Sequence, residues 1–270
     1  MTHKQFTSWR DLKTFIDELR SGAEFIWRGH SDAQWELSSS LYRYFESQRI
    51  PPDSRRDLED AAIAQFTGPQ LDQGGGGSTR SGNTMSLLVE MQHHGCPTRL
   101  MDWTWSPYIA AYFVLPDMAD QGTLYALNIT EYQQFVAPKL PLDDYDLGLL
   151  PTLPDRIFLR FLGAPDLGFP IPITERASSG RSAEQQSIFL LDLNIATTTE
   201  RVLATLPVNV LWKLDFPRTI RPHVHSDLLE MNIDGQHLFG GTHGAALRAK
   251  EWLFGAKWHG HSIKTRDVSY

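Results

Sequence analysis

Arg28 is the first residue in this sequence whose chemistry stands out. It lies in the run Phe25–His30, and its bulky apolar neighbours make this an unfavourable place for a charge without a partner or an anionic ligand. A guanidinium binds phosphate at two points, and Gly29 beside it would let a ligand approach the backbone. The alternative is a structural ion pair, with Asp102 as the partner.

A second group of reactive side chains lies between Gln92 and Asp102. Gln92, His93 and His94 end a predicted helix, where histidines often interact with free carbonyls, and we expect at least one to face a pocket. Asp102 could act as a general base if it were desolvated. The alternative is that Arg99 and Asp102 tie neighbouring elements together, and for Arg99 this is the favoured interpretation.

Other candidate residues favour ordinary roles. Cys96 follows a helix-stopping glycine and precedes a proline, a place that suits a packed side chain better than a nucleophile. The close histidine pairs at 223/225 and 259/261 do not match the spacing of known metal motifs. We therefore expect no metal site.

Hydrophobic periodicity predicts the elements that position these residues. Capping residues support the ends, since Ser8 precedes the first helix and Ser106 with Pro107 opens another. The predicted helices are Trp9–Leu19, Arg55–Phe66, Thr84–His94, Tyr108–Leu115, Pro222–Met231 and Gly244–Phe254. The predicted strands are Phe25–His30, Gly122–Ile129, Ile188–Leu193 and Val210–Phe216, with a possible short element at Ile157–Leu162. Helices and strands mixed in this order predict one α+β domain over residues 1–270, in which residues 200–270 have no assigned role.

Composition limits the possible partners. The formal net charge is −7, and no dense run of Lys or Arg is present, so strong non-specific binding to nucleic acid is not expected and a nuclease is disfavoured. A lone cysteine cannot form an internal disulfide, and no apolar stretch is long enough to span a bilayer. We expect a cytoplasmic protein that does not bind membranes.

The segment Gly74–Ser78 has the composition of a flexible linker. We expect an engineered replacement of a longer natural loop, with a natural glycine-rich loop as the alternative. It does not resemble a phosphate-binding loop, because it lacks the Gly-Lys-Ser/Thr ending and no strand leads into it.

Three sequence motifs resemble those of the FRG-domain family, which is named for a Phe-Arg-Gly motif. The first is Trp27-Arg28-Gly29-His30, with tryptophan in place of phenylalanine, followed by Trp35-Glu36-Leu37 and Ser40-Leu41-Tyr42-Arg43. The most specific is Met91-Gln92-His93-His94-Gly95-Cys96-Pro97-Thr98-Arg99-Leu100, which continues into Asp102-Trp103-Thr104 and Ser106-Pro107. The third, from Arg181 to Phe189, is weaker.

The order of these motifs is also similar, more distantly, to that of ADP-ribosyltransferases. Such a resemblance implies an α+β fold with a split mixed or antiparallel sheet flanked by helices. It also implies binding of NAD or a related nucleotide, with ADP-ribosyl transfer or NAD hydrolysis as the reaction. The acceptor, protein or nucleic acid, is unknown, and a toxin or phage-defence role follows only by analogy.

This resemblance assigns roles residue by residue. Arg28, with Gly29 and His30 beside it, would hold the pyrophosphate or the nicotinamide ribose, while Thr104 and Ser106 would support the strand under the nicotinamide. Trp103 belongs to a cluster of tryptophans, mostly core, of which one could stack on the adenine or nicotinamide ring. The glutamate that stabilises the transition state in that family corresponds to Gln186, which carries no charge, and Glu184 would have to replace it. This departure leaves a second interpretation open, in which the protein is a non-catalytic module that recognises a small anion or a protein partner.

Overall fold

The computed structural model describes residues 1–72, 84–136, 138, 168–173 and 185–258. Several features singled out above therefore lie outside the described residues, among them the histidine pair 259/261 and the start of the third motif at Arg181. The others are the suspected linker Gly74–Ser78, the possible element Ile157–Leu162 and the candidate Glu184.

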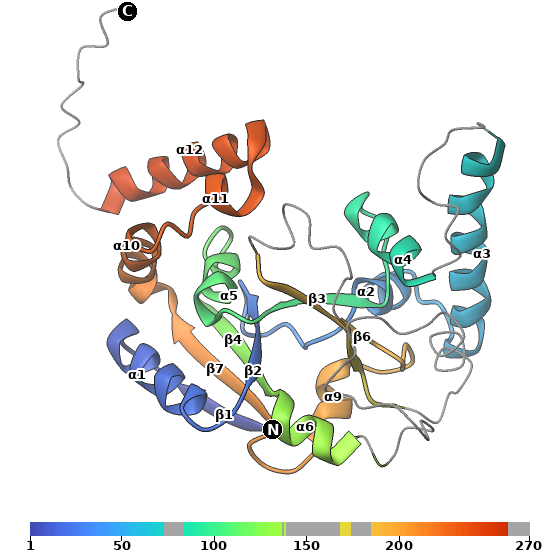
Figure 1. The fold of residues 1–270 in the computed structure, drawn as a ribbon, viewed down its shortest axis with the longest axis horizontal. Helices are drawn as coiled ribbons and strands as arrows, with labels where there is room; N and C mark the ends of the chain where they lie inside the picture. The colour runs from blue at the N-terminus through green and yellow to red at the C-terminus, as the bar shows by residue number, and fades with distance from the viewer. Residues whose placement is uncertain (73–83, 137, 139–167, 174–184, 259–270) are drawn as a thin grey trace, which may run out of the picture.

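Seven strands form one mixed sheet in the order β1-β7-β4-β2-β3-β6-β5 (Figure 1). Only β1 and β7 pair in parallel, and all other neighbours are antiparallel. The strands are β1 (Thr2–Gln5), β2 (Phe25–His30), β3 (Leu100–Thr104), β4 (Gln121–Asn128), β5 (Ile171–Ile173), β6 (Ser187–Leu191) and β7 (Leu211–Pro217). The α+β prediction is confirmed.

The sheet consists of two halves that a single residue pair joins. Strands β2 and β4 pair over six positions, but β2 and β3 share only the pair Trp27 and Thr104, after which the two strands diverge. We call β1, β7, β4 and β2 the four-strand half, and β3, β6 and β5 the three-strand half. The expected split is therefore a local gap within one continuous sheet, and Arg28, Gly29 and His30 follow the joining pair along β2.

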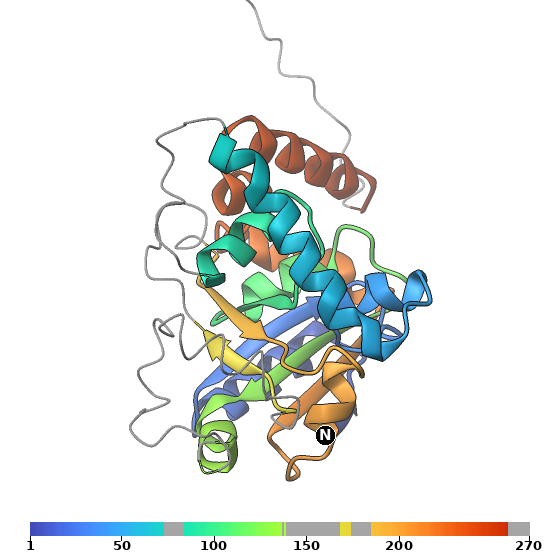
Figure 2. The same ribbon diagram turned by 90° about the vertical axis from the view of Figure 1, so that its right-hand side faces the viewer.

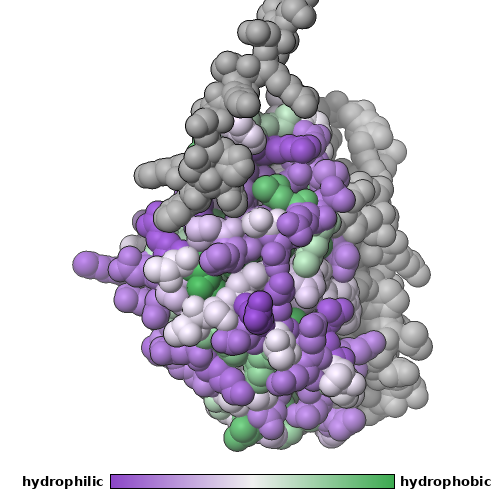
Figure 3. All heavy atoms as spheres, turned by 90° about the vertical axis from the view of Figure 1, so that its left-hand side faces the viewer, coloured by the Kyte–Doolittle hydropathy of each residue, from purple (hydrophilic) through white to green (hydrophobic). Residues whose placement is uncertain are grey.

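Helices pack on one face of the four-strand half. On this face α1 (Trp9–Arg20), α5 (Pro107–Val114) and α10 (Arg221–Glu230) share a core with Trp27, Leu124 and Phe216 (Figure 1). Ser8 caps α1 and Ser106 caps α5, as the sequence predicts. The outer surface of this side is mainly hydrophilic, with hydrophobic residues in separate spots (Figure 3).

Gly29 permits the close packing of α5 on this face. A Cβ at Gly29 would lie 2.1 Å from the backbone oxygen of Ala110 and 2.8 Å from Val114, and a Cβ at Gly122 would lie 2.3 Å from Val114. Because real Cβ contacts are never this short, α5 could not occupy its place if either strand carried a side chain there. The glycine of the first motif thus lets a helix, rather than a ligand alone, approach the backbone.

Of the remaining helices, α2 (Ser40–Ser47), α3 (Pro52–Asp72) and α4 (Thr84–His93) lie beside the three-strand half, α6 (Ile129–Val136) and α9 (Thr199–Ala204) lie at the lower edge, and α11 (Gly235–Phe239) and α12 (Gly241–Trp258) lie above α5 and α10 (Figures 1 and 2). Residues 211–217 form β7, which lies between β1 and β4, so the part of the chain after residue 200 completes the sheet. Within the described residues, no helix is both long and apolar enough to cross a membrane. A 3-10 turn, η3 (Arg218–Ile220), follows β7.

Candidate functional site

A pocket of roughly 760 Å³ lies where the two halves of the sheet diverge, between α4 on one side and α5 with α11 on the other. Its floor comes from β2, β3 and β6, and its volume lies in the range typical of small-molecule sites. The residues that line it on the α4 side are Ser86, Val89, Glu90, Gln92 and His93, and those on the α5 and α11 side are Ala110, Phe113 and Phe239. The floor residues are Trp27, Arg28, Gly29, Asp102, Trp103, Thr104, Gln185, Ser187 and Phe189.

The two walls differ in chemistry. Phe113 and Phe239 form an apolar wall, with ring centroids 6.1 Å apart at a steep angle, and the Phe113 side chain is partly exposed although it is aromatic. The opposite wall is mainly polar and carries the carboxylate of Glu90, and the adjoining floor carries that of Asp102. An apolar surface that faces a few polar groups is the usual composition of a ligand site.

The guanidinium of Arg28 lies in the gap between β2 and β3. Its Nη1 donates a hydrogen bond to the backbone oxygen of Asp102, a carbonyl on the strand from which β2 diverges. Its Nε donates to Nε2 of His30 at 3.2 Å. Burial lowers the pKa of Arg28, while the charge of Asp102 acts in the opposite direction. Among the described residues no carboxylate lies within ion-pair distance of Arg28, so the ion pair with Asp102 considered above is not formed, and Arg28 contacts the Asp102 backbone instead.

His30 faces away from the pocket, against the ring of Tyr125 at 5.1 Å. Burial is the largest cause that lowers the pKa of His30 to about 3, and the nearby cations Arg28 and Arg43 lower it further. The imidazole is therefore neutral at physiological pH, and its Nε2 accepts the hydrogen bond from Arg28.

Gln92 holds the carboxylate of Asp102 in place. Its Nε2 lies 2.8 and 2.9 Å from the two carboxylate oxygens, and its Oε1 accepts a hydrogen bond from the Thr98 hydroxyl at 2.6 Å. The Thr98 contact fixes which end of the amide faces Asp102. We call this chain of contacts, from Thr98 through Gln92 to Asp102, the relay. It accounts for the spacing of these three polar residues in the second motif, and it presents an exposed carboxylate to the pocket.

Arg99 anchors the pocket floor from below. It forms a fully buried ion pair with Glu59 of α3, through Nε at 2.6 Å and through Nη2, and Nη1 donates to the Asp192 backbone oxygen. The structural interpretation favoured for Arg99 by the sequence is what the structure shows.

The third motif places a different glutamine in the pocket from the one expected. Gln185 lines the pocket, and its Nε2 donates to the Leu238 oxygen at 3.1 Å. Gln186 is not among the lining residues; it has a φ of 48°, and its carbonyl accepts from the Trp105 amide. Thr104 ties this segment down, since its hydroxyl donates to the Gln185 oxygen at 2.8 Å and accepts from the Ser106 amide at 3.1 Å.

The structure thus brings most of the candidate residues to one place. Arg28, Gly29, Gln92, His93, Asp102, Trp103 and Thr104 all line the pocket. The others among the described candidates, His30, His94, Ser106 and Gln186, are not among its lining residues. The sequence argument missed Glu90 and the aromatic wall, although Phe113 follows the second motif directly. No group of three or more His, Cys, Asp or Glu side chains suited to a metal ion occurs in the described part of the chain.

Residues 23–122 match the family model of the FRG domain. The chain carries an FRG domain. This match spans β2, the relay from Gln92 to Asp102 and α5, so the FRG domain supplies Arg28, the polar wall and Phe113. No curated protein and no solved structure shows a match to the chain.

Proposed function

We propose that this FRG-domain protein binds NAD or a related nucleotide in the pocket and cleaves the bond between nicotinamide and ribose. The observation that carries the proposal is an exposed carboxylate, Asp102, which Gln92 orients beside the cation Arg28 in a pocket with an aromatic wall. In this arrangement a planar ring would pack against Phe113 and Phe239, and Arg28 would attract the phosphate side of the ligand.

The proposed reaction needs one well-placed negative charge. When the bond between C1′ and the nicotinamide nitrogen breaks, the electron pair leaves with nicotinamide, and positive charge develops on the ribose. Asp102 would stabilise that charge, a role which the neutral Gln186 cannot fill. Water or an acceptor group would then add to C1′ and release a proton, which gives hydrolysis or ADP-ribosyl transfer. Either outcome fits a toxin or phage-defence role, because loss of NAD or modification of an acceptor harms a cell.

Release of nicotinamide, followed by chromatography, tests this proposal. We expect Asp102→Asn to slow release by roughly 10²–10³-fold, since the change removes the charge but keeps the shape. Asn also retains the hydrogen-bonding capacity to Gln92 in part, so the fold should persist. A matched control is Asp17→Asn on α1, which should leave the rate unchanged. Equal rates for wild type and Asp102→Asn would reject Asp102 as the catalytic carboxylate.

The second candidate is a recognition module without turnover. It is favoured by the two hydrogen bonds that already engage Arg28 within the protein and by the uncharged Gln186 at the glutamate position. Binding of NAD with no nicotinamide release in any variant, including Gln186→Glu, would support this candidate over the enzyme.

A further inference from the structure

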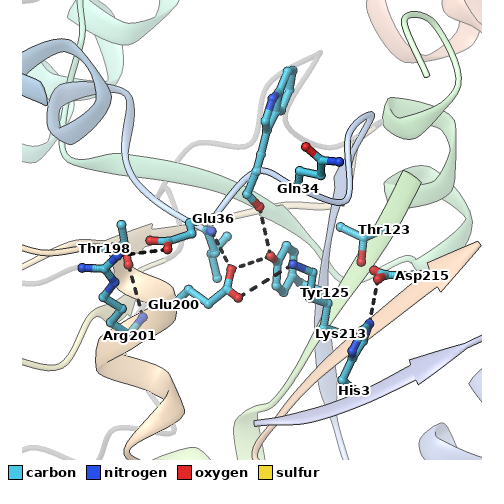
Figure 4. Close-up of polar contacts among 12 residues, drawn as sticks. His3, Gln34, Glu36, Thr123, Tyr125, Thr198, Glu200, Arg201, Lys213 and Asp215 are labelled. Carbon is cyan, nitrogen blue, oxygen red and sulfur yellow. Dashed lines mark hydrogen bonds and ion pairs between the residues drawn. The ribbon is translucent and has the colours of Figure 1, made fainter. Parts of the chain in front are cut away.

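The face of the sheet opposite α5 carries a group of polar residues, of which the proposed function uses only Arg28. Cross-strand partners point to the same side of a sheet, so each register row defines a set of neighbours. The two rows, taken across β2, β4 and β7, are Arg28–Tyr125–Lys213 and His30–Thr123–Asp215. Figure 4 shows Tyr125, Thr123, Lys213 and Asp215 grouped on this face.

The charge of Lys213 is balanced within this group. Its Nζ lies 3.8 Å from the carboxylate of Glu200, which also accepts from the Tyr125 hydroxyl at 2.6 Å and from the Leu37 amide at 2.9 Å (Figure 4). Asp215 is likewise engaged, since His3 lies 2.6 Å from it. Arg28 and Arg43 are the other two cations that act on His30.

Arg28 and Arg43 lack a carboxylate in direct contact in the part of the chain that the structure describes. Within the described residues neither guanidinium forms an ion pair; Arg28 is partly exposed, and Arg43 on α2 is exposed with one hydrogen bond to the Ser38 oxygen. Glu36, an acid on the loop before α2, pairs with Arg201, and the Asp102 carboxylate acts on Arg28 from the pocket side. The low pKa of His30 agrees with an excess of positive charge here, because Arg28, Arg43 and Lys213 all lower it after burial.

An exposed aromatic ring stands beside these cations. Trp35 is 56% exposed, and its ring centroid lies 6.3 Å from that of His30. The loop that carries Trp35 is fixed, since the Trp35 oxygen accepts from Tyr125 at 3.3 Å and the Leu37 amide donates to Glu200. An exposed indole on a fixed backbone offers a stacking surface for a base.

We propose that Arg28, Arg43 and Trp35 form a second ligand site, for a nucleoside monophosphate. Guanidinium groups provide paired donors for the phosphate oxygens, and the indole provides a face for the base. This site lies on the side of β2 opposite α5, across the gap that Arg28 fills, and it does not depend on the NAD role of the pocket. A nucleotide bound here would contact Arg28 from one side while the pocket ligand contacts it from the other.

Titration calorimetry with AMP and with inorganic phosphate tests the second site. We expect Arg43→Gln to weaken AMP at least tenfold, and Trp35→Ala to weaken AMP while leaving inorganic phosphate unchanged. A matched control is Arg10→Gln on α1, an exposed arginine on the other side of the sheet, which should bind AMP as wild type does. Phe113→Ala, which alters only the pocket, should also leave AMP binding intact, so failure of the two proposals can be told apart.

Three results would overturn this second site. They are no AMP binding by the folded protein, equal weakening by Arg43→Gln and Arg10→Gln, and loss of AMP binding in Phe113→Ala, which would place AMP in the pocket. Circular dichroism of each variant confirms that its fold is intact before the titration is interpreted.

Discussion

The two halves of the sheet differ in what covers the face that meets α5. In the four-strand half, α1, α5 and α10 cover this face, and Gly29 and Gly122 let α5 come close to the strands. In the three-strand half, the same face carries Asp102, Phe189 and Ser187 and forms the floor of the pocket. The first FRG motif therefore serves both halves of the sheet. Gly29 lets α5 pack on the four-strand half, and Arg28 lies in the gap between the two halves.

The largest expected effect is on the pH dependence of folding stability, and it comes from His30 in the four-strand half. Its pKa is about 3 in the folded protein against an ordinary 6.5, so the unfolded chain binds a proton between pH 6.5 and 3 that the folded chain does not. Folding free energy is therefore lost on acidification across this window, by roughly 5 kcal/mol from this group. Urea denaturation at pH 7 and pH 4 should show a smaller acid loss in His30→Gln than in wild type.

Asp192, next to the three-strand half, should act with the opposite sign. Burial raises its pKa to about 6 from 3.8, so the folded protein binds the extra proton and gains stability as the pH falls from 6 to 4. Asp192→Asn should remove this gain and make the acid loss steeper than in wild type. If both variants kept the wild-type pH profile, these two groups would not be the titrating ones.

The anchor of the three-strand half comes next. Arg99→Met leaves the Glu59 carboxylate buried without its partner, which should cost about 3–5 kcal/mol of unfolding free energy in urea melts. The control is Arg56→Met on α3, the helix that carries Glu59. Its pair with Asp60 is exposed and should contribute below about 1 kcal/mol. Similar losses in both variants would contradict the anchoring role.

The packing of α5 on the four-strand half can be disrupted at Gly29. Gly29→Ala should cost about 3 kcal/mol or more, because the added methyl group meets the Ala110 carbonyl and α5 must shift. Gly22→Ala is the matched control, since nothing lies within 4 Å of its added methyl group. Thermal melts of both variants measure the difference, and equal midpoints would mean that α5 moves without cost.

The smallest expected effect lies in the open pocket. Gln92→Ala frees the Asp102 carboxylate to rotate and should slow nicotinamide release by about tenfold to a hundredfold, with little change in stability. Gln48→Ala, an exposed glutamine at the end of α2, serves as the control. An unchanged rate in Gln92→Ala would mean that the orientation of Asp102 does not matter.

Local patterns predicted the longer elements with clear periodicity or caps, but not β1, β5, α2, α6, α9 and α11. The periodicity and caps of α1, β2 and α5 are properties of adjacent residues, and the structure places these elements within about one residue of the predicted bounds. Local patterns could not predict contacts between segments that are far apart in the sequence. Glu59 is forty residues from Arg99, and Phe239 joins the pocket only because α11 packs beside α5. Whether Gln185 or Gln186 lines the pocket depends on the positive φ of Gln186. Glutamine rarely adopts such a φ, and the local sequence does not reveal it.

Binding of NAD to the purified protein, measured by calorimetry, tests the central claim most directly. We predict saturable binding to wild type, at least tenfold weaker binding to Phe113→Ala, and unchanged binding to Trp252→Ala, an exposed aromatic on α12 outside the pocket. Absence of NAD binding by the folded wild type, or equal affinity in wild type and Phe113→Ala, would contradict the assignment of this pocket.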